Sequence, residues 1–343
     1  MNMHSGEFNA YSLSFEDDDI QLSIVSEKPK PPASDEVRIA IGAASLNYRD
    51  LLVRKGQDSS ALPKLAPLSD GAGEIVEIGD DVSDWKVGDR VVVSFFPNWE
   101  RGRFSPPDHG LALGGNHDGV AAEQITIGQG ALVRIPNYLS FAQASTLPCA
   151  AVTAWGALFE RSNPITSGDI VLIQGTGGVA IFGLQLAKAV GAKVIALSSS
   201  DEKLEQVKTL GADIGINYRK TPNWAEAVRE ATNGHGADHI LELGGVETFE
   251  QSIAAVAGSG VISQIGVLTG FGPQPNLHGL LTASATINGI LVGPRAYLEN
   301  LVSFLEEHRI EPVVDKEYAF GELEAAYEHL ESGAHIGKVV ISV

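Results

Sequence analysis

The sequence is short of cysteine, of basic residues and of long apolar runs. Its single cysteine, Cys149, excludes an intrachain disulfide and a structural zinc site built from several cysteines, and it fits a reducing compartment. Lys and Arg number 24 against 43 Asp and Glu, and the net charge of −19 argues against a nucleic-acid or anionic-membrane partner. No run approaches the roughly 18 apolar residues that span a bilayer, and the amino terminus does not resemble a secretory signal. These absences predict a soluble, cytoplasmic protein.

What is present is ordinary for a globular protein. Hydrophobic residues make up 44% of the chain and charged residues 20%, which is enough apolar material for two buried cores. At roughly 150 residues per domain, the length predicts two domains. The pattern changes character near residue 150, so we expect one domain from residues 1–150 with 294–343, and a second from residues 151–293.

The first part of the chain predicts short strands separated by turn residues. These strands are Glu36–Gly42, Glu74–Ile78, Arg90–Val93, Glu123–Ile127 and Leu132–Ile135. Such a series predicts a compact, mostly antiparallel β-barrel, to which the last strand, Gly337–Val343, is expected to return. The long segment Phe95–Gly119 has few regular signals. It is either a lid or specificity loop, or a loop without function.

The second part alternates strands with amphipathic helices. The expected strands are Ile170–Ile173, Lys193–Leu197, Ile214–Asn217, His239–Leu243, Val261–Gly266 and Thr286–Val292. The helices between them include a stretch from Val179 to Val190, Asp201–Leu210, Asn223–Thr232 and Glu247–Val256. Apolar strands connected by helices predict an α/β fold with a parallel, doubly wound sheet.

The most specific motif lies between the first of these strands and its helix. It reads Gly175-Thr176-Gly177-Gly178-Val179-Ala180 and matches the G-x-G-x-x-G/A pattern in the context that gives it meaning. Gly175 permits a tight turn, Gly177 lets the backbone approach a pyrophosphate, and Ala180 is small enough for close helix–strand packing. The helix amino terminus then offers N–H groups to the phosphates, so the motif predicts a bound dinucleotide.

The residues after the second strand predict which dinucleotide binds. An NAD site has Asp or Glu there, about 20 residues after the glycines, to accept from the ribose 2′-hydroxyl. This chain has Ser198, Ser199 and Ser200, whose hydroxyls can donate to a 2′-phosphate, and Lys203 adds positive charge nearby. Asp201 opposes this, but it stands where a helix amino cap is expected. We therefore expect NADP(H) rather than NAD(H).

Several motifs together resemble the medium-chain dehydrogenase/reductase superfamily, in its zinc-independent alcohol dehydrogenase-like and quinone oxidoreductase-like branch. The resemblance covers nearly the whole chain and rests on the glycine motif and on Asn47–Leu52, Pro67–Val76, Lys86–Val91, Thr146–Trp155 and His335–Val340. It implies a GroES-like barrel domain beside a Rossmann domain, with the nicotinamide in the cleft between the two.

The chain departs from the zinc-containing members in the first two of the three motifs that bind their metal. Asn47 stands where they have a cysteine, Ser69-Asp70 replaces a His-Glu pair, and only Cys149 remains. One thiolate without an imidazole partner cannot build a tetrahedral N/S site, so we expect no zinc and interpret Cys149 as a small buried hydrophobe. His235 and His239 lie in a turn and strand, where their spacing does not predict a metal site.

Without zinc, hydrogen-bond donors must stabilise the substrate oxygen. Asn47 can donate an amide N–H and Tyr48 a phenolic proton, while Asp50 and Asp70 are candidates for organising these donors. Two alternatives stay open: Tyr48 can simply fill the end of the barrel, and Asn47 can cap backbone in a turn.

The resemblance alone implies further cofactor contacts and a subunit contact. The implied cofactor residues are Thr153, Gly266, Val267, Leu268, Gly293, Arg295, His335, Gly337 and Lys338. Strand Thr286–Val292 is at the sheet edge in this family and implies a homodimer.

The leading hypothesis is a zinc-independent, NADPH-dependent oxidoreductase. It would transfer hydride between the nicotinamide and a small aldehyde or ketone, or the corresponding alcohol. The alternative is reduction of a quinone or of the C=C bond of an enone, because the same fold serves both chemistries. A third hypothesis is a protein that binds NADPH without turnover.

Overall fold

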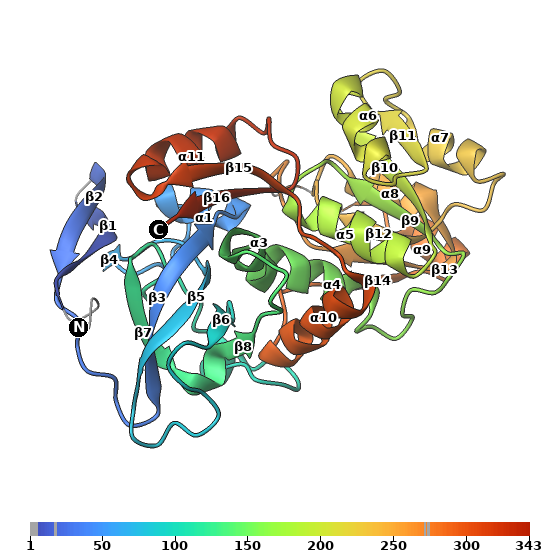
Figure 1. Ribbon diagram of the computed structural model, residues 1–343. Coiled ribbons are helices and arrows are strands. Elements are labelled where there is room, and N and C mark those ends of the chain that lie inside the picture. Colours follow the sequence, from blue (N-terminus) through green and yellow to red (C-terminus); the bar gives the residue numbers. More distant parts are fainter. Residues whose placement is uncertain (1–5, 17–18, 271, 273–274) are drawn as a thin grey trace. The chain divides into compact units, whose positions relative to one another are not determined.

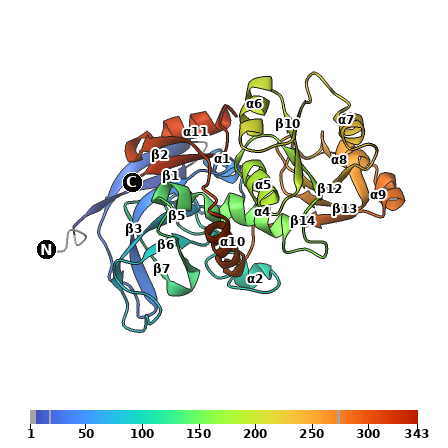
Figure 2. The ribbon, with the colours of Figure 1, turned by 45° about the vertical axis from the view of Figure 1, so that its right-hand side comes forward.

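The computed structural model describes residues 6–16, 19–270, 272 and 275–343. Contacts divide the chain into two compact units (Figures 1 and 2). One unit is Thr153–Leu291, here called the nucleotide unit. The other contains the described residues up to Val152 together with Val292–Val343, here called the barrel unit. No helix in the described part of the chain is long and apolar enough to cross a membrane.

The nucleotide unit is built on a parallel six-stranded sheet. Its strands are β9 (Ile170–Gln174), β10 (Lys193–Ser198), β11 (Ile214–Asn217), β12 (Ala237–Glu242), β13 (Val256–Gln264) and β14 (Thr286–Gly289). They lie in the order β11-β10-β9-β12-β13-β14, and every neighbouring pair is parallel (Figure 1). The chain therefore turns back between β9 and β12, and this confirms the predicted doubly wound fold.

Helices connect these strands and pack against them. They are α4 (Val152–Leu158), α5 (Gly178–Ala189), α6 (Asp201–Thr209), α7 (Trp224–Ala231), α8 (Phe249–Ala255) and α9 (His278–Ala283). The core under α7 and α8 contains Trp224, Val228, Phe249 and Ile253, all at most 7% exposed. Burial of these apolar side chains against the sheet is the main force holding this unit together.

The predicted strand boundaries in this unit differ most at the start of β13 and the end of β14. β13 begins at Val256, five residues before the predicted Val261, and runs through Gly258-Ser259-Gly260. Ser259 has a φ of +59°, and the pairing with β12 shifts between Ala237 and His239, so the strand passes the glycines with an irregularity instead of ending there. β14 ends at Gly289, short of the predicted Val292.

The barrel unit is mostly antiparallel. Its larger sheet contains β15 (Val314–Ala319), β16 (Lys338–Ser342), β3 (Glu36–Ser45), β5 (Asp70–Ile78), β6 (Arg90–Val93) and β8 (Leu132–Arg134) in that order, and β7 (Gln124–Gly128) also pairs with β3. β16 pairs with β3 antiparallel, so the last strand does return to the barrel as predicted. Only β15 and β16 pair in parallel among these described strands.

The sequence reasoning missed a hairpin at the amino-terminal end of the described chain. β1 (Phe8–Glu16) and β2 (Asp19–Glu27) pair antiparallel, and β1 also pairs with β4 (Lys64–Leu65). Leu13, Val53 and Leu65 form a small buried cluster beneath them. The alternation of Ile20, Leu22 and Ile24 with polar residues was an available signal for a strand.

Short helices complete the barrel unit. They are α1 (Tyr48–Arg54), α2 (Pro106–His109), η1 (Gln129–Ala131), α3 (Phe141–Ser145), the π-helix η2 (Leu147–Ala151), α10 (Arg295–His308), η3 (Phe320–Glu322) and α11 (Leu323–Glu331). A π-helical turn is rare and is often found near functional residues. Here η2 carries Cys149.

The segment Phe95–Gly119 is ordered mainly by aromatic packing. Phe95, Phe96 and Trp99 are at most 7% exposed. The ring centroids of Phe96 and Trp99 are 5.9 Å apart, and those of Trp99 and Phe104 are 4.9 Å apart. Because its large rings are buried in a common cluster, the first part of this segment is packed structure and not a free loop.

Candidate functional site

The glycine motif forms a strand–turn–helix with an open helix amino terminus. β9 ends at Gln174, and Gly175 follows with a φ of +80°, a backbone conformation that favours glycine. Gly177 is the N-cap of the twelve-residue helix α5, and no side chain caps this end in the described contacts. The first N–H groups of α5 are therefore available, with the positive end of the helix dipole, for an anionic ligand.

Close packing behind the turn depends on two small residues of α5. Ala180, the predicted packing residue, is fully buried. Gly183 comes still closer to the sheet: a Cβ atom there would lie 2.3 Å from Leu241 Cδ1, on the buried strand β12. The small residues hold the amino terminus of α5 against the sheet edge, where the phosphates of a dinucleotide are expected.

A buried glutamate that the sequence reasoning missed shapes the next loop at this edge. Glu242, the last residue of β12, has no exposed surface, and its carboxylate accepts hydrogen bonds from Gly244 N (3.0 Å), Gly245 N (2.9 Å) and Gln174 Nε2 (2.7 Å). The signal for it was a glutamate at the end of an apolar strand, before Leu243-Gly244-Gly245. This carboxylate fixes the start of the loop by satisfying its N–H groups.

The loop after β13 lies against the loop after β12. Gly266 N donates to Glu242 O at 3.0 Å, and a Cβ on Gly266 would lie 2.1 Å from Leu243 O. Glycine is therefore required where these two loops touch. Gly266, Val267 and Leu268 stand at the same edge of the sheet as the glycine motif, and Leu268 is 53% exposed. Thr153, also in this unit, is buried in α4.

The serines after β10 fold back onto their own backbone. Ser198 Oγ accepts from Ser200 N at 3.2 Å, and Ser200 is the N-cap of α6, accepting from Lys203 N at 3.3 Å. The expectation that Asp201 is the cap is therefore wrong. Asp201 is the first residue of the helix, and its carboxylate accepts from Asn217 Nδ2 at 2.7 Å and pairs with Lys220.

The pairing of Asp201 changes its effect on a phosphate ligand. The hydrogen bond from Lys220 lowers the pKa of Asp201, so the carboxylate is ionised with a lysine charge beside it. Lys220 and Arg219 follow β11, the strand next to β10, and sequence reasoning missed both. Basic residues directly after a strand on the ribose side of the sheet were the available signal. Tyr218 N also donates to Ser198 O at 3.1 Å, which ties this turn to the serines.

In the barrel unit, Asn47 lies between the end of β3 and the start of α1. Its side chain belongs to a buried polar cluster. Its backbone N–H donates to Asp50 Oδ2 at 2.7 Å, while its side-chain Nδ2 donates to Ser69 Oγ at 3.3 Å. Asn47 is 8% exposed. Asn47 is also the N-cap residue of α1, in agreement with one of the alternatives left open, and its carboxamide in addition bonds across the fold to Ser69 and Lys338.

The cluster continues through Asp70 to a lysine on the last strand. Ser69 Oγ donates to Asp70 Oδ1 at 2.6 Å, and Cys149 N donates to Asp70 Oδ2 at 3.0 Å. Lys338 Nζ donates to Leu46 O at 2.6 Å and to Asn47 Oδ1, and it lies 4.0 Å from Asp70 Oδ2. Burial raises the pKa of Asp70, and the Lys338 charge acts in the opposite direction.

Asp50 and Tyr48 differ in exposure to solvent although both are in α1. Asp50 is 1% exposed, and burial raises its pKa to about 6, with Arg49 opposing this. Tyr48 is 42% exposed. Its side chain therefore does not fill the end of the barrel, which was one of the two interpretations left open.

Cys149 is only partly buried, so the expectation of a fully buried small hydrophobe is too strong. The pKa of its thiol is nevertheless raised, mainly by burial and to a smaller extent by the negative charge of the nearby Asp70. At neutral pH the thiol is therefore protonated.

The other predicted cofactor residues of the barrel unit include Gly293, His335 and Gly337. Gly337, directly before Lys338, has a φ of +81°, and His335 precedes it. Gly293 packs closely on Tyr297 of α10, because a Cβ there would lie 2.4 Å from the Tyr297 ring.

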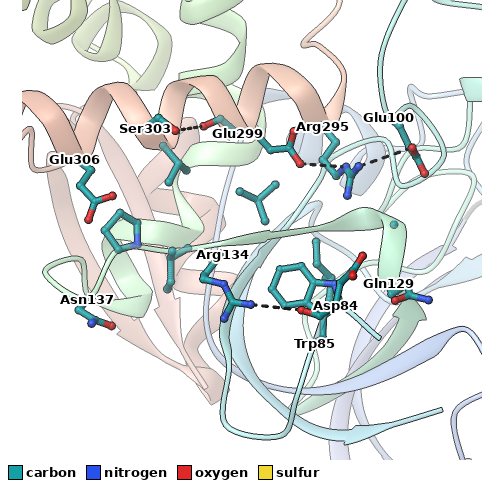
Figure 3. Close-up of a pocket in the computed structure, with 16 residues that line it drawn as sticks. Asp84, Trp85, Glu100, Gln129, Arg134, Asn137, Arg295, Glu299, Ser303 and Glu306 are labelled. Atoms are coloured by element: carbon teal, nitrogen blue, oxygen red, sulfur yellow. Dashed lines mark hydrogen bonds and ion pairs between the residues drawn. The ribbon is translucent and has the colours of Figure 1, made fainter. Parts of the chain in front are cut away.

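Arg295 lies in a surface pocket of about 900 Å³ within the barrel unit (Figure 3). Its guanidinium lies 3.7 Å from Glu100 and 3.6 Å from Glu299, and Arg134, Trp85 and Glu306 line other parts of the pocket (Figure 3). The charges of this pocket are of both signs, and Arg295 pairs with two of its carboxylates, Glu100 and Glu299. It does not include the Asn47 cluster.

These features define a class of protein. A parallel sheet with a reversal of strand order, a glycine turn and an uncapped helix amino terminus is characteristic of dinucleotide-binding enzymes. The second, mostly antiparallel unit adds a buried cluster of donors and carboxylates. The chain is built as a dinucleotide-dependent oxidoreductase of two units.

Comparison with known proteins identifies the family. Residues 33–137 match the alcohol dehydrogenase GroES-like domain, and residues 178–307 match the zinc-binding dehydrogenase family. A zinc-type alcohol dehydrogenase-like protein of Schizosaccharomyces pombe is 46% identical over 325 residues, which cover 92% of this chain and 93% of that protein. The chain belongs to the medium-chain dehydrogenase/reductase superfamily.

Solved structures agree with this assignment. A protein of Sinorhizobium meliloti 1021, provisionally described as an alcohol dehydrogenase, superposes with a TM-score of 0.93 at 41% identity, covering 99% of this chain and 100% of that one. An NAD-dependent alcohol dehydrogenase superposes with a TM-score of 0.87 at 30% identity, covering 98% and 99%. The chain is thus an alcohol dehydrogenase-like oxidoreductase that uses a nicotinamide cofactor.

Proposed function

We propose that this protein transfers hydride between NADPH and a small aldehyde or ketone, or the corresponding alcohol, without zinc. The observation that carries the proposal is the side chain of Asn47, which lies among Ser69, Asp70 and Lys338 at the position where the resemblance places a metal ligand. An amide N–H there can donate to a substrate oxygen as negative charge develops on it.

The residues of the nucleotide unit fit a dinucleotide. The uncapped amino terminus of α5 suits the pyrophosphate, and the turn at Gly175 brings backbone close to it. NADPH, when bound, supplies the hydride from its nicotinamide ring. The protein's part is to bind it, to orient it and to stabilise the charge that forms on the substrate oxygen.

A preference for NADPH is supported by the charges after β10 and β11. No carboxylate follows β10 until Asp201, and that carboxylate is paired with Lys220 and Asn217. Lys203 and Arg219 add positive charge to the same turn region. The NAD-dependent relative shows that the family also includes enzymes that use the other cofactor, so this preference needs a direct test.

The residues at the expected metal positions do not suit zinc. Asp70 already accepts from Ser69 and Cys149 N, burial keeps the Cys149 thiol protonated, and the Lys338 ammonium stands beside Asp70. Across the described residues, no group of three or more His, Cys, Asp or Glu side chains gathers to hold a metal. His235 and His239 face different carboxylates, Asp238 and Asp169. These observations support a donor-based mechanism.

Product analysis with cinnamaldehyde and NADPH tests the reaction. Cinnamyl alcohol is the expected product, identified by mass and NMR, because the donors of the Asn47 cluster suit a carbonyl oxygen. Hydrocinnamaldehyde would instead establish the alternative of C=C reduction. NADPH binding without turnover of cinnamaldehyde, simple ketones or quinones would establish a binding protein and overturn the proposed activity.

Metal analysis tests the absence of zinc. After dialysis against EDTA, we expect activity to be unchanged and zinc to be substoichiometric by mass spectrometry. Stoichiometric zinc, with activity that disappears on its removal and returns when it is added back, would overturn the zinc-free proposal but not the oxidoreductase assignment.

We further propose a homodimer that forms along the edge strand β14. It is the last strand of the nucleotide sheet, so one of its edges has no neighbour among the described strands. Leu281 and Leu291, which flank β14 in the sequence, are 77% and 51% exposed, and Leu277 is 49% exposed. An unpaired edge with exposed leucines nearby favours association with a second copy.

A further inference from the structure

The hydrogen bonds of the polar cluster around Asn47 run in one direction, from Lys338 to Asp70. Lys338 Nζ donates to Asn47 Oδ1, Asn47 Nδ2 donates to Ser69 Oγ, and Ser69 Oγ donates to Asp70 Oδ1. The cluster closes where Asp70 Oδ2 lies 4.0 Å from Lys338 Nζ. Asn47 and Ser69 each accept from one neighbour and donate to the next, while Lys338 only donates and Asp70 only accepts.

Strand register brings these residues together. Ser45 of β3 pairs with Asp70 of β5 on one side and with Val340 of β16 on the other. Antiparallel pairing continued from Ser45 and Val340 sets Asn47 opposite Lys338, and Leu46 N donates to Val339 O at 3.0 Å between them. Asp70 and Lys338 begin β5 and β16, while Asn47 and Ser69 lie within two residues of β3 and β5, so the pairing of these three strands sets their positions.

The lysine determines which way the Asn47 carboxamide faces. An ammonium group has three donors and no acceptor, so only the amide oxygen of Asn47 can lie against Lys338 Nζ. The amide nitrogen must then face the other way, toward Ser69, where one of its two hydrogens is used. With a neutral, non-donating side chain at position 338, the carboxamide could rotate and present its oxygen, which would repel a developing oxyanion.

We propose that Lys338 is a positioning residue, whose buried ammonium holds the Asn47 carboxamide with its amide nitrogen, and not its oxygen, on the side of the substrate, and supplies the positive charge beside Asp70. The inference rests on the proposed function, because it assigns Asn47 to the substrate oxygen. It differs from the cofactor contact that the family resemblance implies for Lys338. That side chain is 3% exposed, and its two hydrogen bonds in the described structure go to Leu46 O and Asn47 Oδ1.

The test combines Lys338→Met with Asn47→Ala in a double-mutant cycle. Each single variant should lower kcat about tenfold to a hundredfold, and the double variant should be no slower than Asn47→Ala alone, because Lys338 acts through Asn47. The dissociation constant for NADPH, measured by fluorescence, should change less than twofold. Additive losses in kcat, or weakened NADPH binding with kcat retained, would overturn the proposal.

Two further variants guard against simple unfolding. Lys338→Met/Asp70→Asn removes both buried charges together, so it should fold and still show the loss in kcat. Lys316→Met, on the neighbouring strand β15, replaces an exposed lysine and should leave kcat and stability unchanged. Recovery of wild-type kcat in the Lys338→Met/Asp70→Asn variant would contradict the proposal, because Asn47 would then need no ammonium.

A measurement that does not depend on turnover separates this inference from the proposed function. In protein labelled with ¹⁵N-asparagine, the side-chain amide signal of Asn47 is identified by its loss in Asn47→Ala. It should shift and exchange faster with water in Lys338→Met. If the wild type reduces no carbonyl, the proposed function fails, and this signal still tests the orientation. An unchanged signal in Lys338→Met would overturn the inference even in an active enzyme.

Discussion

At the residue scale, burial decides what the carboxylates can do. Asp50 and Asp70 are at most 1% exposed, and both have raised pKa values, whereas the exposed Asp201 has a lowered one because of Lys220. Nothing in the sequence neighbourhood of these three aspartates separates them. Their protonation behaviour follows from which partners and how much water the fold leaves around each.

Asp50 should make stability depend on pH. Its pKa is raised from 3.8 in the unfolded chain to about 6 in the fold, so the native state binds the proton more tightly. This contribution to stability is fully present below about pH 4 and is lost as pH rises through about 6, a change of about 3 kcal/mol. Asp50→Asn should therefore show a smaller fall in the free energy of unfolding across this range.

Urea denaturation at about pH 4 and pH 6.5 measures this effect. Asp80→Asn, at an exposed carboxyl, serves as the matched control and should behave as the wild type. If Asp50→Asn and the wild type lose stability in parallel, Asp50 does not titrate as its burial implies.

At the element scale, the proposed preference for NADPH rests on the turns after β10 and β11. Ser200 begins α6 as its cap, Asp201 turns toward Lys220, and Tyr218 N bonds Ser198 O across the two strand ends. The elements therefore form one polar edge from two separate segments. A sequence reading of the second strand alone finds the serines and misses Arg219 and Lys220.

Ser199→Asp should turn the enzyme toward NADH. Ser199 is partly buried directly after β10, where a carboxylate would repel a 2′-phosphate and accept from a ribose 2′-hydroxyl. The ratio of kcat/KM for NADPH to that for NADH should fall at least about tenfold, given the strength of like-charge repulsion at this range. Ser199→Ala should keep the preference. An unchanged ratio in Ser199→Asp would place the 2′-position of the cofactor elsewhere.

At the scale of the whole molecule, the residues of the proposed function come from both units. The nucleotide unit contains the glycine turn at Gly175 and the strand ends where we propose that the cofactor binds, while the barrel unit contains the Asn47 cluster. The barrel unit is made from two separate stretches of the chain, because Val292–Val343 returns to it through the pairing of β16 with β3. Lys338 thereby lies beside Asn47 although 291 positions separate them in the chain.

The quaternary proposal belongs to this scale. Leu281→Glu should weaken a dimer that forms along β14, because it places a charge on an exposed apolar residue next to the edge strand. Light scattering after size exclusion should show a dimer for the wild type and a larger monomer fraction for the variant. Val87→Glu, at an exposed apolar residue of the barrel unit, is the control. A monomeric wild type would contradict the proposal.

Much of the fold could be predicted because it depends on local patterns. The strands of the nucleotide sheet and the turn at Gly175 follow from apolar periodicity and from glycine's access to positive φ. The predicted end of β14 and start of β13 were wrong because pairing with a neighbour, not local propensity, ends a strand. The hairpin of β1 and β2 was missed although its alternation was visible.

The sequence by itself determined the doubly wound sheet, the glycine turn, the return of the last strand to the barrel and the absence of an intrachain disulfide. The sheet and the turn depend on residues close in the chain and the last on composition, while the return of the last strand follows because six strands already complete the parallel sheet. Only the tertiary structure decided that Lys338 donates to Asn47, that Glu242 holds the loop after β12, and that Asp201 faces Lys220. Lys338 and Asn47 are 291 positions apart, Asp201 and Lys220 are 19 apart, and Glu242 also bonds Gln174, 68 positions away. The energies of these contacts arise from burial and from directional hydrogen bonds that exist only once the chain is folded.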